Sequence, residues 1–455
     1  MLFNSAEYLF LFLPFCLLLH YFLRGNTLRM AGLVILSAWF YMAAFPVYIF
    51  ILLGLIAVDY VAAIWMDKSE GLNRKLWLWF CLLSNILLLA SFKYWNFTAG
   101  NINILGCNLP LHDWALPVGL SFHTFQSMSY AIEVYRKAWP AEKNLLRYSL
   151  YILFFPQMVA GPIERPQNIL PQFLHFKGFS LEDFREGLFQ LARGLFMKAA
   201  VADRLSLFVN PIFEHPEQAN SAQSVLAILF FTIQIYADFS GYSNMALGSA
   251  RMLGIRLMVN FQQPYLASSL SDFWRRWHIS LSTWFRDYLY IPLGGNRNGA
   301  IAASGNLLLV FLVSGLWHGA GWNFLLWGLL HGLGLVAENL LGKKAKEFGP
   351  HWFKLLRTQI WVMLCWVFFR ATSMDNALAV FKGALGFGSG TLSPEFYPAE
   401  IAYGLALLIL IPISESLKLQ ENCFRKFPWI SVISLLIFSY SLGNFKASSF
   451  LYFQF

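Results

Sequence analysis

Long apolar runs separated by short polar segments recur along the chain. A membrane-spanning helix needs about 20 mostly apolar residues. The runs that approach this length cover residues 8–23, 30–44, 47–66, 76–92, 115–132, 148–160, 225–239, 306–317, 322–341, 360–369, 401–413 and 429–442. Because several of them are short, the pattern predicts about ten to twelve crossings plus some partial ones. No long polar insertion and no internal repeat interrupts them.

The pattern becomes irregular between residues 155 and 299, where prolines, glycines, charges and aromatic residues are mixed. Broken backbone at membrane depth is tolerated only where it is buried in protein or lines a cavity. We therefore expect re-entrant or tilted helices around a central chamber, flanked by regular spans. The predicted fold class is all-α, a polytopic membrane helical bundle, forming a single domain over residues 1–455 with a motif-rich region at about 117–332.

Composition supports the membrane interpretation. Of the 455 residues, 58% are hydrophobic and 13% are charged, whereas soluble domains carry roughly 25% charged residues. The net charge of +9 resides mostly in short segments between apolar runs, where basic residues set topology and meet anionic lipid headgroups. This distribution argues against nucleic-acid binding. The five cysteines form no CxxC pair, so neither a disulfide framework nor a metal site is predicted.

The first apolar run does not have the features of a cleavable signal peptide. It is preceded by Glu7, and no basic residue occurs before Arg24, so a positively charged start is missing. Arg24 and Arg29 follow the run and belong in the cytoplasm by the positive-inside rule. The N-terminus is therefore predicted to lie outside the cytoplasm.

The segment LSDFWRRWHISLSTWFRDYLY, residues 270–290, has two contrasting faces if it is one helix. At 100° per residue, large apolar side chains fall within about 80° of one another; they are Phe273, Trp277, Leu281, Trp284 and Tyr288. The opposite face carries Ser271, Arg275, His278, Ser282 and Arg286. One interpretation is a helix lying in the interface with its basic side toward lipid phosphate. The other is a lined cavity, which His278 favours, with Arg275 and Ser282 as candidate substrate contacts.

A second polar segment, LWHGAGWNF, interrupts an apolar stretch at residues 316–324. An ionisable residue such as His318 inside a membrane segment indicates a functional site, although a histidine hydrogen-bonded between helices is the alternative. Asn323 is a further candidate contact. His331 would lie about 140° further round a continuous helix, so we expect it to be structural.

Three other polar positions leave two interpretations open. Asp238, in QIYADFSGY, is expected to pair with an arginine or a backbone donor, either as a contact between helices or in the cavity. Arg165 follows Glu164 after a Gly–Pro break, which suits a cavity mouth or a self-satisfied turn. Tyr452 lies in the aromatic segment FLYFQF, which either anchors at the membrane interface or reaches a reactive centre.

These motifs together resemble a known family. The run DFWRRWHISLSTWFRDYLYIPLGGNRNG, followed by LWHGAGWNFLLWGLLHG, is similar to the membrane-bound O-acyltransferase superfamily, in particular to its alginate O-acetylase branch. Supporting motifs are SFHTFQSMSYAIEVYR, FPQMVAGPIERP and ADFSGYSNMALG. The resemblance covers most of residues 117–332 and extends to the N-terminal MLFNSAEYLFLFLP.

The resemblance implies a funnel-shaped bundle with histidines at its narrow centre. His318 matches the family's catalytic histidine and His278 the second histidine of this branch. The implied reaction moves an acetyl group from a cytoplasmic thioester such as acetyl-CoA, with no covalently bound cofactor, toward an exported polysaccharide such as alginate. An extracytoplasmic acetyltransferase or esterase partner and polysaccharide export machinery are implied as well, at the bacterial inner membrane. The segment containing Tyr452 resembles an aromatic tail of the D-alanylation pathway, which suggests an acyl relay.

Two other function classes fit a membrane bundle with a polar cavity. A transporter or flippase of an acyl carrier buries ionisable residues along its pathway, but paired broken helices in corresponding halves are not evident. A noncatalytic scaffold of a polysaccharide export complex is the third class, and it predicts no effect of changing His278 or His318.

Overall fold

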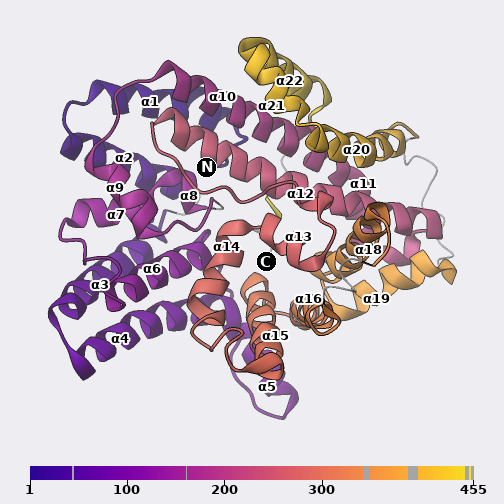
Figure 1. Ribbon diagram of the computed structural model, residues 1–455, viewed down its shortest axis with the longest axis horizontal. Coiled ribbons are helices and arrows are strands. Elements are labelled where there is room, and N and C mark those ends of the chain that lie inside the picture. The colour runs from indigo at the N-terminus through magenta and orange to yellow at the C-terminus, as the bar shows by residue number, and fades with distance from the viewer. Residues whose placement is uncertain (44–45, 160, 343–347, 388–397, 446–449, 452–455) are drawn as a thin grey trace. The chain divides into compact units, whose positions relative to one another are not determined.

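The computed structural model of the chain describes all residues except 44–45, 160, 343–347, 388–397, 446–449 and 452–455. Throughout the described part, the secondary structure is helical and no strand occurs (Figure 1). Six of its helical segments are long and apolar enough to cross a membrane, and two shorter apolar helices cover Tyr8–Phe22 and Pro428–Leu442. The all-α, polytopic class is thereby confirmed. The number of crossings, the central funnel and the single domain over residues 1–455 stay predictions.

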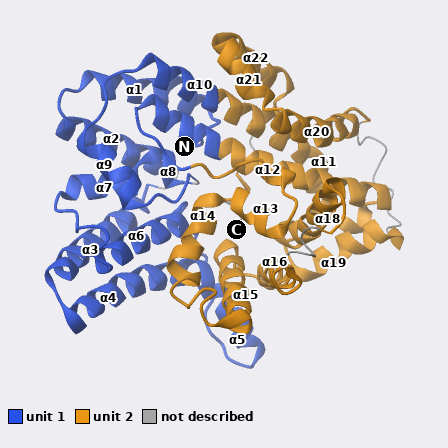
Figure 2. Ribbon diagram, viewed as in Figure 1, with its two compact units in different colours: residues 1–191, 243–258 blue, residues 192–242, 259–455 orange. Residues whose placement is uncertain are grey.

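The chain divides into two compact units, each described by itself (Figure 2). Unit 1 comprises residues 1–191 and 243–258. Its helices are α1 (Leu13–Phe22), α2 (Asn26–Met42), α3 (Ile49–Lys68), α4 (Gly71–Leu89), α5 (Trp95–Ile104), α6 (Leu120–Tyr135), α7 (Leu145–Leu153), α8 (Phe155–Met158), α9 (Pro166–Leu174) and most of α10 (Leu181–Leu195), with π-helical turns η1 (Tyr8–Phe12) and η2 (Ala90–Tyr94).

Unit 2 comprises residues 192–242 and 259–455. Its helices are α11 (Asp203–Glu214), the first part of α12 (Ser221–Met252), α13 (Leu270–Arg276), α14 (Ile279–Phe285), α15 (Gly299–His318), α16 (Trp322–Leu340), α18 (His351–Arg370), α19 (Met374–Lys382), α20 (Pro398–Ser416), α21 (Leu419–Lys426) and α22 (Pro428–Leu442). It also holds short turns η3 (Phe196–Ala202), η4 (Pro216–Gln218), η5 (Pro264–Leu266), η6 (Arg286–Tyr290) and η7 (Gly383–Phe387).

Helices α15 and α16 form a tightly packed hairpin. A Cβ atom added at Gly315 would lie 2.3 Å from the Phe324 carbonyl oxygen, and one added at Gly328 would lie 2.3 Å from that of Phe311. The two backbones therefore touch, as small residues allow between membrane helices. Because α15 ends at His318, this close contact determines where that histidine lies.

Residues 155–299, whose sequence pattern is irregular, contain both short elements and one long helix. Within residues 155–299, the expected broken backbone occurs as the short elements around α8, α13 and α14. However, the same region contains α12, a continuous helix of 32 residues that is long enough to span a membrane. This helix contains the predicted span at 225–239, and its sequence includes no proline. The re-entrant or tilted helices expected in this region stay a prediction.

Candidate functional site

His318 is the last residue of α15 and is buried, with 5% of its surface exposed. The helix stops there because Gly319 adopts an extended conformation, and α16 begins after Gly321, which is also extended. A side chain at Gly319 would collide with the Phe324 ring. The glycines thus allow the sharp reversal that leaves His318 at the end of the hairpin.

His278 lies at a break between α13 and α14, so the expectation of one continuous helix over residues 270–290 is wrong. The His278 backbone is left-handed, with φ 43° and ψ 55°. For a residue other than glycine this conformation costs roughly 1–2 kcal/mol. The predicted aromatic face is nevertheless buried as expected: Phe273, Trp277, Leu281, Trp284 and Tyr288 are each at most 8% exposed.

Hydrogen bonds to residues 260–262 stabilise the break between α13 and α14. The Ile279 N–H donates to the Asn260 carbonyl oxygen (2.9 Å), and the Gln262 N–H donates to the Arg276 carbonyl oxygen (3.0 Å). The Ser280 hydroxyl also bonds to the Asn260 side-chain oxygen at 2.7 Å. Backbone groups released by the interrupted helix are therefore paired, which explains how the chain sustains an unfavourable conformation at His278.

The start of α13 is fixed in turn by α16. The Glu338 carboxylate accepts hydrogen bonds from the backbone N–H of Leu270 (2.7 Å) and from the hydroxyl of Ser271 (3.0 Å). A carboxylate suits the first turn of a helix because the backbone N–H groups there have no partner inside the helix. This contact ties the element that carries His278 to the hairpin that carries His318.

The two histidines from separate motifs face a common aromatic enclosure. Their ring centroids are 6.4 Å apart. The His318 ring contacts Trp327 (5.0 Å) and Phe369 (5.2 Å), and the His278 ring meets Phe239 edge-on at 4.6 Å. His278 is 1% exposed, and burial lowers its pKa to about 3. Its imidazole is therefore neutral near pH 7, as a proton acceptor must be.

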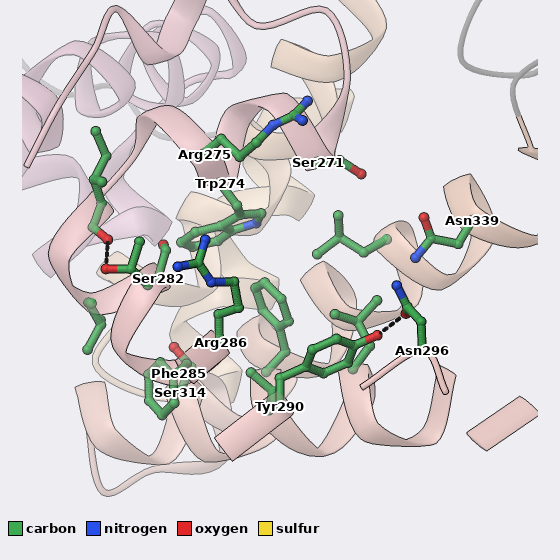
Figure 3. Close-up of a pocket in the computed structure, with 17 residues that line it drawn as sticks. Ser271, Trp274, Arg275, Ser282, Phe285, Arg286, Tyr290, Asn296, Ser314 and Asn339 are labelled. Carbon is green, nitrogen blue, oxygen red and sulfur yellow. Dashed lines mark hydrogen bonds between the residues drawn. The ribbon is translucent and has the colours of Figure 1, made fainter. Parts of the chain in front are cut away.

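A cavity of about 500 Å³ is lined by residues of α13, α14, η6, α15 and α16, the elements next to the two histidines in the chain (Figure 3). Both Arg275 and Ser282, expected as cavity contacts, line it, together with Arg286. Neither histidine lines it, but Ile279 follows His278, and Ser314 precedes His318 by about one helical turn. Most of the lining is apolar or aromatic, and its lining residues include no carboxylate. The cavity therefore suits an amphiphilic ligand with an anionic group.

Asp238 is buried in an ion-paired cluster rather than in this cavity. Its carboxylate accepts from the Lys198 ammonium at 2.6 Å and from the Leu451 N–H at 2.9 Å. The expected backbone donor is present, whereas the expected arginine is in fact a lysine. Burial alone lowers the pKa of Lys198, but the carboxylates of Asp238 and Asp203 outweigh it and raise that pKa above its usual value.

The remaining candidates lie elsewhere. The Asn323 amide donates to the carbonyl oxygens of Ala371 (2.7 Å) and Phe368 (3.2 Å), which joins the start of α16 to the end of α18. Arg165 lies in unit 1, where it precedes α9. Tyr452 lies outside the described residues.

His331, which we expect to be structural, lies among tryptophan rings. It is completely buried, and its ring lies 4.9 Å from Trp274 and 5.1 Å from Trp327. The premise of one continuous helix from His318 was wrong, because Gly319–Gly321 interrupts it. Trp327 lies between His318 and His331 and contacts both rings. Among the described residues, no three His, Cys, Asp or Glu side chains form a possible metal site.

Sequence reasoning missed two residues, one in contact with His278 and one paired with Asp238. Phe239, one position after Asp238, contacts His278, and Lys198 neutralises Asp238. Lys198 had a readable signal, because it is a lone lysine within the apolar run FMKAAVA. Phe239 had none, since one phenylalanine among 45 is indistinguishable without the fold.

Apolar helices of spanning length, together with a buried histidine pair, define an integral membrane protein with a candidate acid–base centre. Comparison with known proteins identifies the family. Residues 136–369 match the membrane-bound O-acyltransferase family, and the chain belongs to that family. It is a membrane O-acyltransferase.

Named relatives cover most of the chain. A probable alginate O-acetylase AlgI of Azotobacter vinelandii is 38% identical, over 86% of this chain and 80% of the relative. A peptidoglycan O-acetyltransferase of Helicobacter pylori is 34% identical, over 86% and 81%. A teichoic acid D-alanyltransferase of Bacillus subtilis is 26% identical, over 59% and 70%. Acyl transfer is common to these names, while the acceptors that they give differ.

Proposed function

We propose that this protein transfers an acetyl group from a cytoplasmic thioester, such as acetyl-CoA, toward hydroxyl groups of an exported polysaccharide. The observation that carries the proposal is the buried pair His278 and His318, whose ring centroids lie 6.4 Å apart. Motifs forty residues apart bring these rings together inside one aromatic enclosure. The named relatives that act on alginate and peptidoglycan support a polysaccharide acceptor.

The chemistry requires one proton acceptor. As the hydroxyl oxygen attacks the thioester carbonyl, His318 takes the hydroxyl proton. A new C–O bond forms, the C–S bond breaks, and the proton passes to the departing thiolate. General-base assistance of this kind accelerates reactions by about 10²–10⁴-fold. His278, kept neutral by burial, orients the acceptor hydroxyl or assists the proton transfer.

The cavity drawn in Figure 3 is the proposed site for the remote part of the donor. Its volume of about 500 Å³ lies in the range of small-molecule sites. Arg275 and Arg286 line it from α13 and η6 (Figure 3). Guanidinium groups recognise phosphate, which coenzyme A and related acyl carriers contain.

The proposed setting is the bacterial inner membrane, with the N-terminus outside the cytoplasm. Arg24 and Arg29 after the first apolar helix support this orientation through the positive-inside rule. An extracytoplasmic acetyltransferase or esterase would complete delivery to the polymer, in company with the export machinery. The relay role of Tyr452 is part of the same proposal, although that residue lies outside the described part of the chain.

Reconstituted protein provides the direct test. The vesicles are given acetyl-CoA that is labelled in the acetyl group. We expect free thiol to appear together with label on added polysaccharide, or with labelled acetate where water is the acceptor. Carriage of intact labelled thioester into the vesicles without thiol release would instead indicate a transporter. Absence of both, while the protein still retains an export complex, would indicate a scaffold.

Substitution of Arg275 by glutamine tests the donor site. We expect KM for the phosphate-containing donor to rise roughly two- to fivefold with little change in kcat, because ion pairs of exposed side chains contribute at most about 1 kcal/mol. Arg276→Gln is the matched control: Arg276 is adjacent, bonds to Asp272 at 2.9 Å, and does not line the cavity. Equal KM changes in both variants would contradict the assignment.

A further inference from the structure

Unit 2 contains a buried ion cluster that the proposed chemistry does not use. The Lys198 ammonium lies 2.7 Å from an Asp203 oxygen and 2.6 Å from an Asp238 oxygen, and at most 3% of each side chain is exposed. Burying charge is costly unless every charge is paired and hydrogen-bonded. Two carboxylates facing one ammonium leave a net negative charge, so the cluster requires further hydrogen-bond donors.

One further donor to the cluster is the backbone N–H of Leu451. The Leu451 N–H donates to the second Asp238 oxygen at 2.9 Å. The Asn444 backbone N–H donates to the Ala199 carbonyl oxygen (3.0 Å), and its side-chain amide donates to the Asp203 carbonyl oxygen (3.3 Å). Leu451 is therefore bonded to the Asp238 carboxylate itself, whereas Asn444 is bonded to the neighbouring backbone at Ala199 and Asp203.

The attached segment reaches the histidine enclosure through two rings. The Phe450 ring stacks on Tyr242 at 4.7 Å and contacts Phe239 at 5.8 Å. Phe239 in turn meets the His278 ring edge-on at 4.6 Å. Phe450 and Phe239 are each at most 1% exposed. Close packing in such an interior transmits a displacement of one ring to the next.

We propose that Asp238, charged and held by Lys198, is a positioning residue that anchors the Phe450–Leu451 segment, and that Phe450 and Phe239 thereby set the position of the His278 ring. This inference rests on the role of His278 in the proposed function. A purely stabilising role would not need these charges, because well-packed apolar residues often replace buried ion pairs without loss of stability. The charges fix the orientation of the Asp238 carboxylate: one of its oxygens faces Lys198, and the other faces the Leu451 N–H.

A proline at position 451 tests the anchor through a single atom. Leu451→Pro removes the N–H that donates to Asp238, while the matched control Leu451→Ala keeps it and removes only side-chain volume. We expect Leu451→Pro to lower kcat for acetyl transfer by about 10- to 100-fold relative to Leu451→Ala, with donor KM unchanged, since small misplacements at a reacting centre have effects of that order. Equal kcat in the two variants would overturn the proposal.

A double-mutant cycle with Asp238→Asn tests whether Asp238 acts on His278 through the Leu451 N–H. If Asp238 acts through the Leu451 N–H, adding Leu451→Pro to Asp238→Asn causes no further loss of kcat. Fully additive losses would mean that the two residues act separately, and would overturn the inference.

Amide hydrogen exchange supplies a measurement that needs no activity. In Asp238→Asn, we expect the Leu451 amide to exchange at least about tenfold faster than in the wild type, because its acceptor is weakened. Unchanged exchange would overturn the anchor. If the Leu451 amide of the wild type is protected from exchange but the protein transfers no acetyl group, the proposed function fails while the anchor stands.

Discussion

The His318→Ala variant is expected to lose acyl transfer by a factor on the order of 10²–10⁴, which is what removal of a general base costs. The physical reason is local. His318 ends α15 within the aromatic enclosure, and its ring is the one that Trp327 and Phe369 hold in place. The measurement is the rate of labelled acetyl transfer by purified protein, with thermal stability and size-exclusion profile recorded beside it.

The control for that variant is another buried histidine in the same unit. His331 is completely buried and also contacts Trp327, so His331→Gln perturbs the same packing without touching the pair. We expect His331→Gln to lower stability yet keep transfer within a fewfold of the wild type. If His318→Ala transfers acetyl groups as fast as this control, His318 is not the base.

The second large effect is expected from Gly328. An added Cβ there would lie 2.3 Å from the Phe311 carbonyl oxygen, so Gly328→Ala must push α15 and α16 apart. Overpacking of this kind costs about 1–3 kcal/mol. Because His318 ends α15, we also expect acetyl transfer to fall, although position 328 itself takes no part in the reaction. Thermal unfolding in detergent and the transfer rate measure the two consequences.

Gly305→Ala provides the matched comparison. Gly305 lies in the same α15 helix, and a Cβ added there meets nothing within 4 Å. Alanine favours a helix over glycine by up to about 1 kcal/mol, so this variant should be at least as stable as the wild type. Equal unfolding temperatures for Gly305→Ala and Gly328→Ala would show that the close approach of the hairpin is not a constraint.

The apolar pattern alone predicted several helices closely. The runs at 47–66 and 322–341 became Ile49–Lys68 and Trp322–Leu340, whereas the run at 306–317 became the longer helix Gly299–His318. These elements were predictable because their apolar length is a local property, read over about twenty residues. The aromatic face of the 270–290 segment was predicted for the same reason, since side-chain periodicity survives across a short interruption.

The break at His278 was not predictable from local sequence. Nothing in RRWHIS disfavours a helix, and the left-handed residue is sustained by Asn260 and Gln262 from a preceding segment. Similarly, the acid at position 238 was recognised as needing a partner, but a lysine forty residues away satisfied it. Such pairings are long-range, so they follow from the fold and cannot be read from residue spacing.

The arrangement of indole rings gives the enclosure an optical property of its own. Trp317 lies 4.8 Å from the His318 ring and 6.2 Å from the His278 ring, and Trp327 lies 5.0 Å from His318. An imidazolium quenches indole emission at such contact distances, whereas neutral imidazole does so far less. We therefore expect the emission of these two tryptophans to vary with the protonation of the histidines. In the proposed reaction, this emission would report, without a label, the step in which a histidine receives the hydroxyl proton.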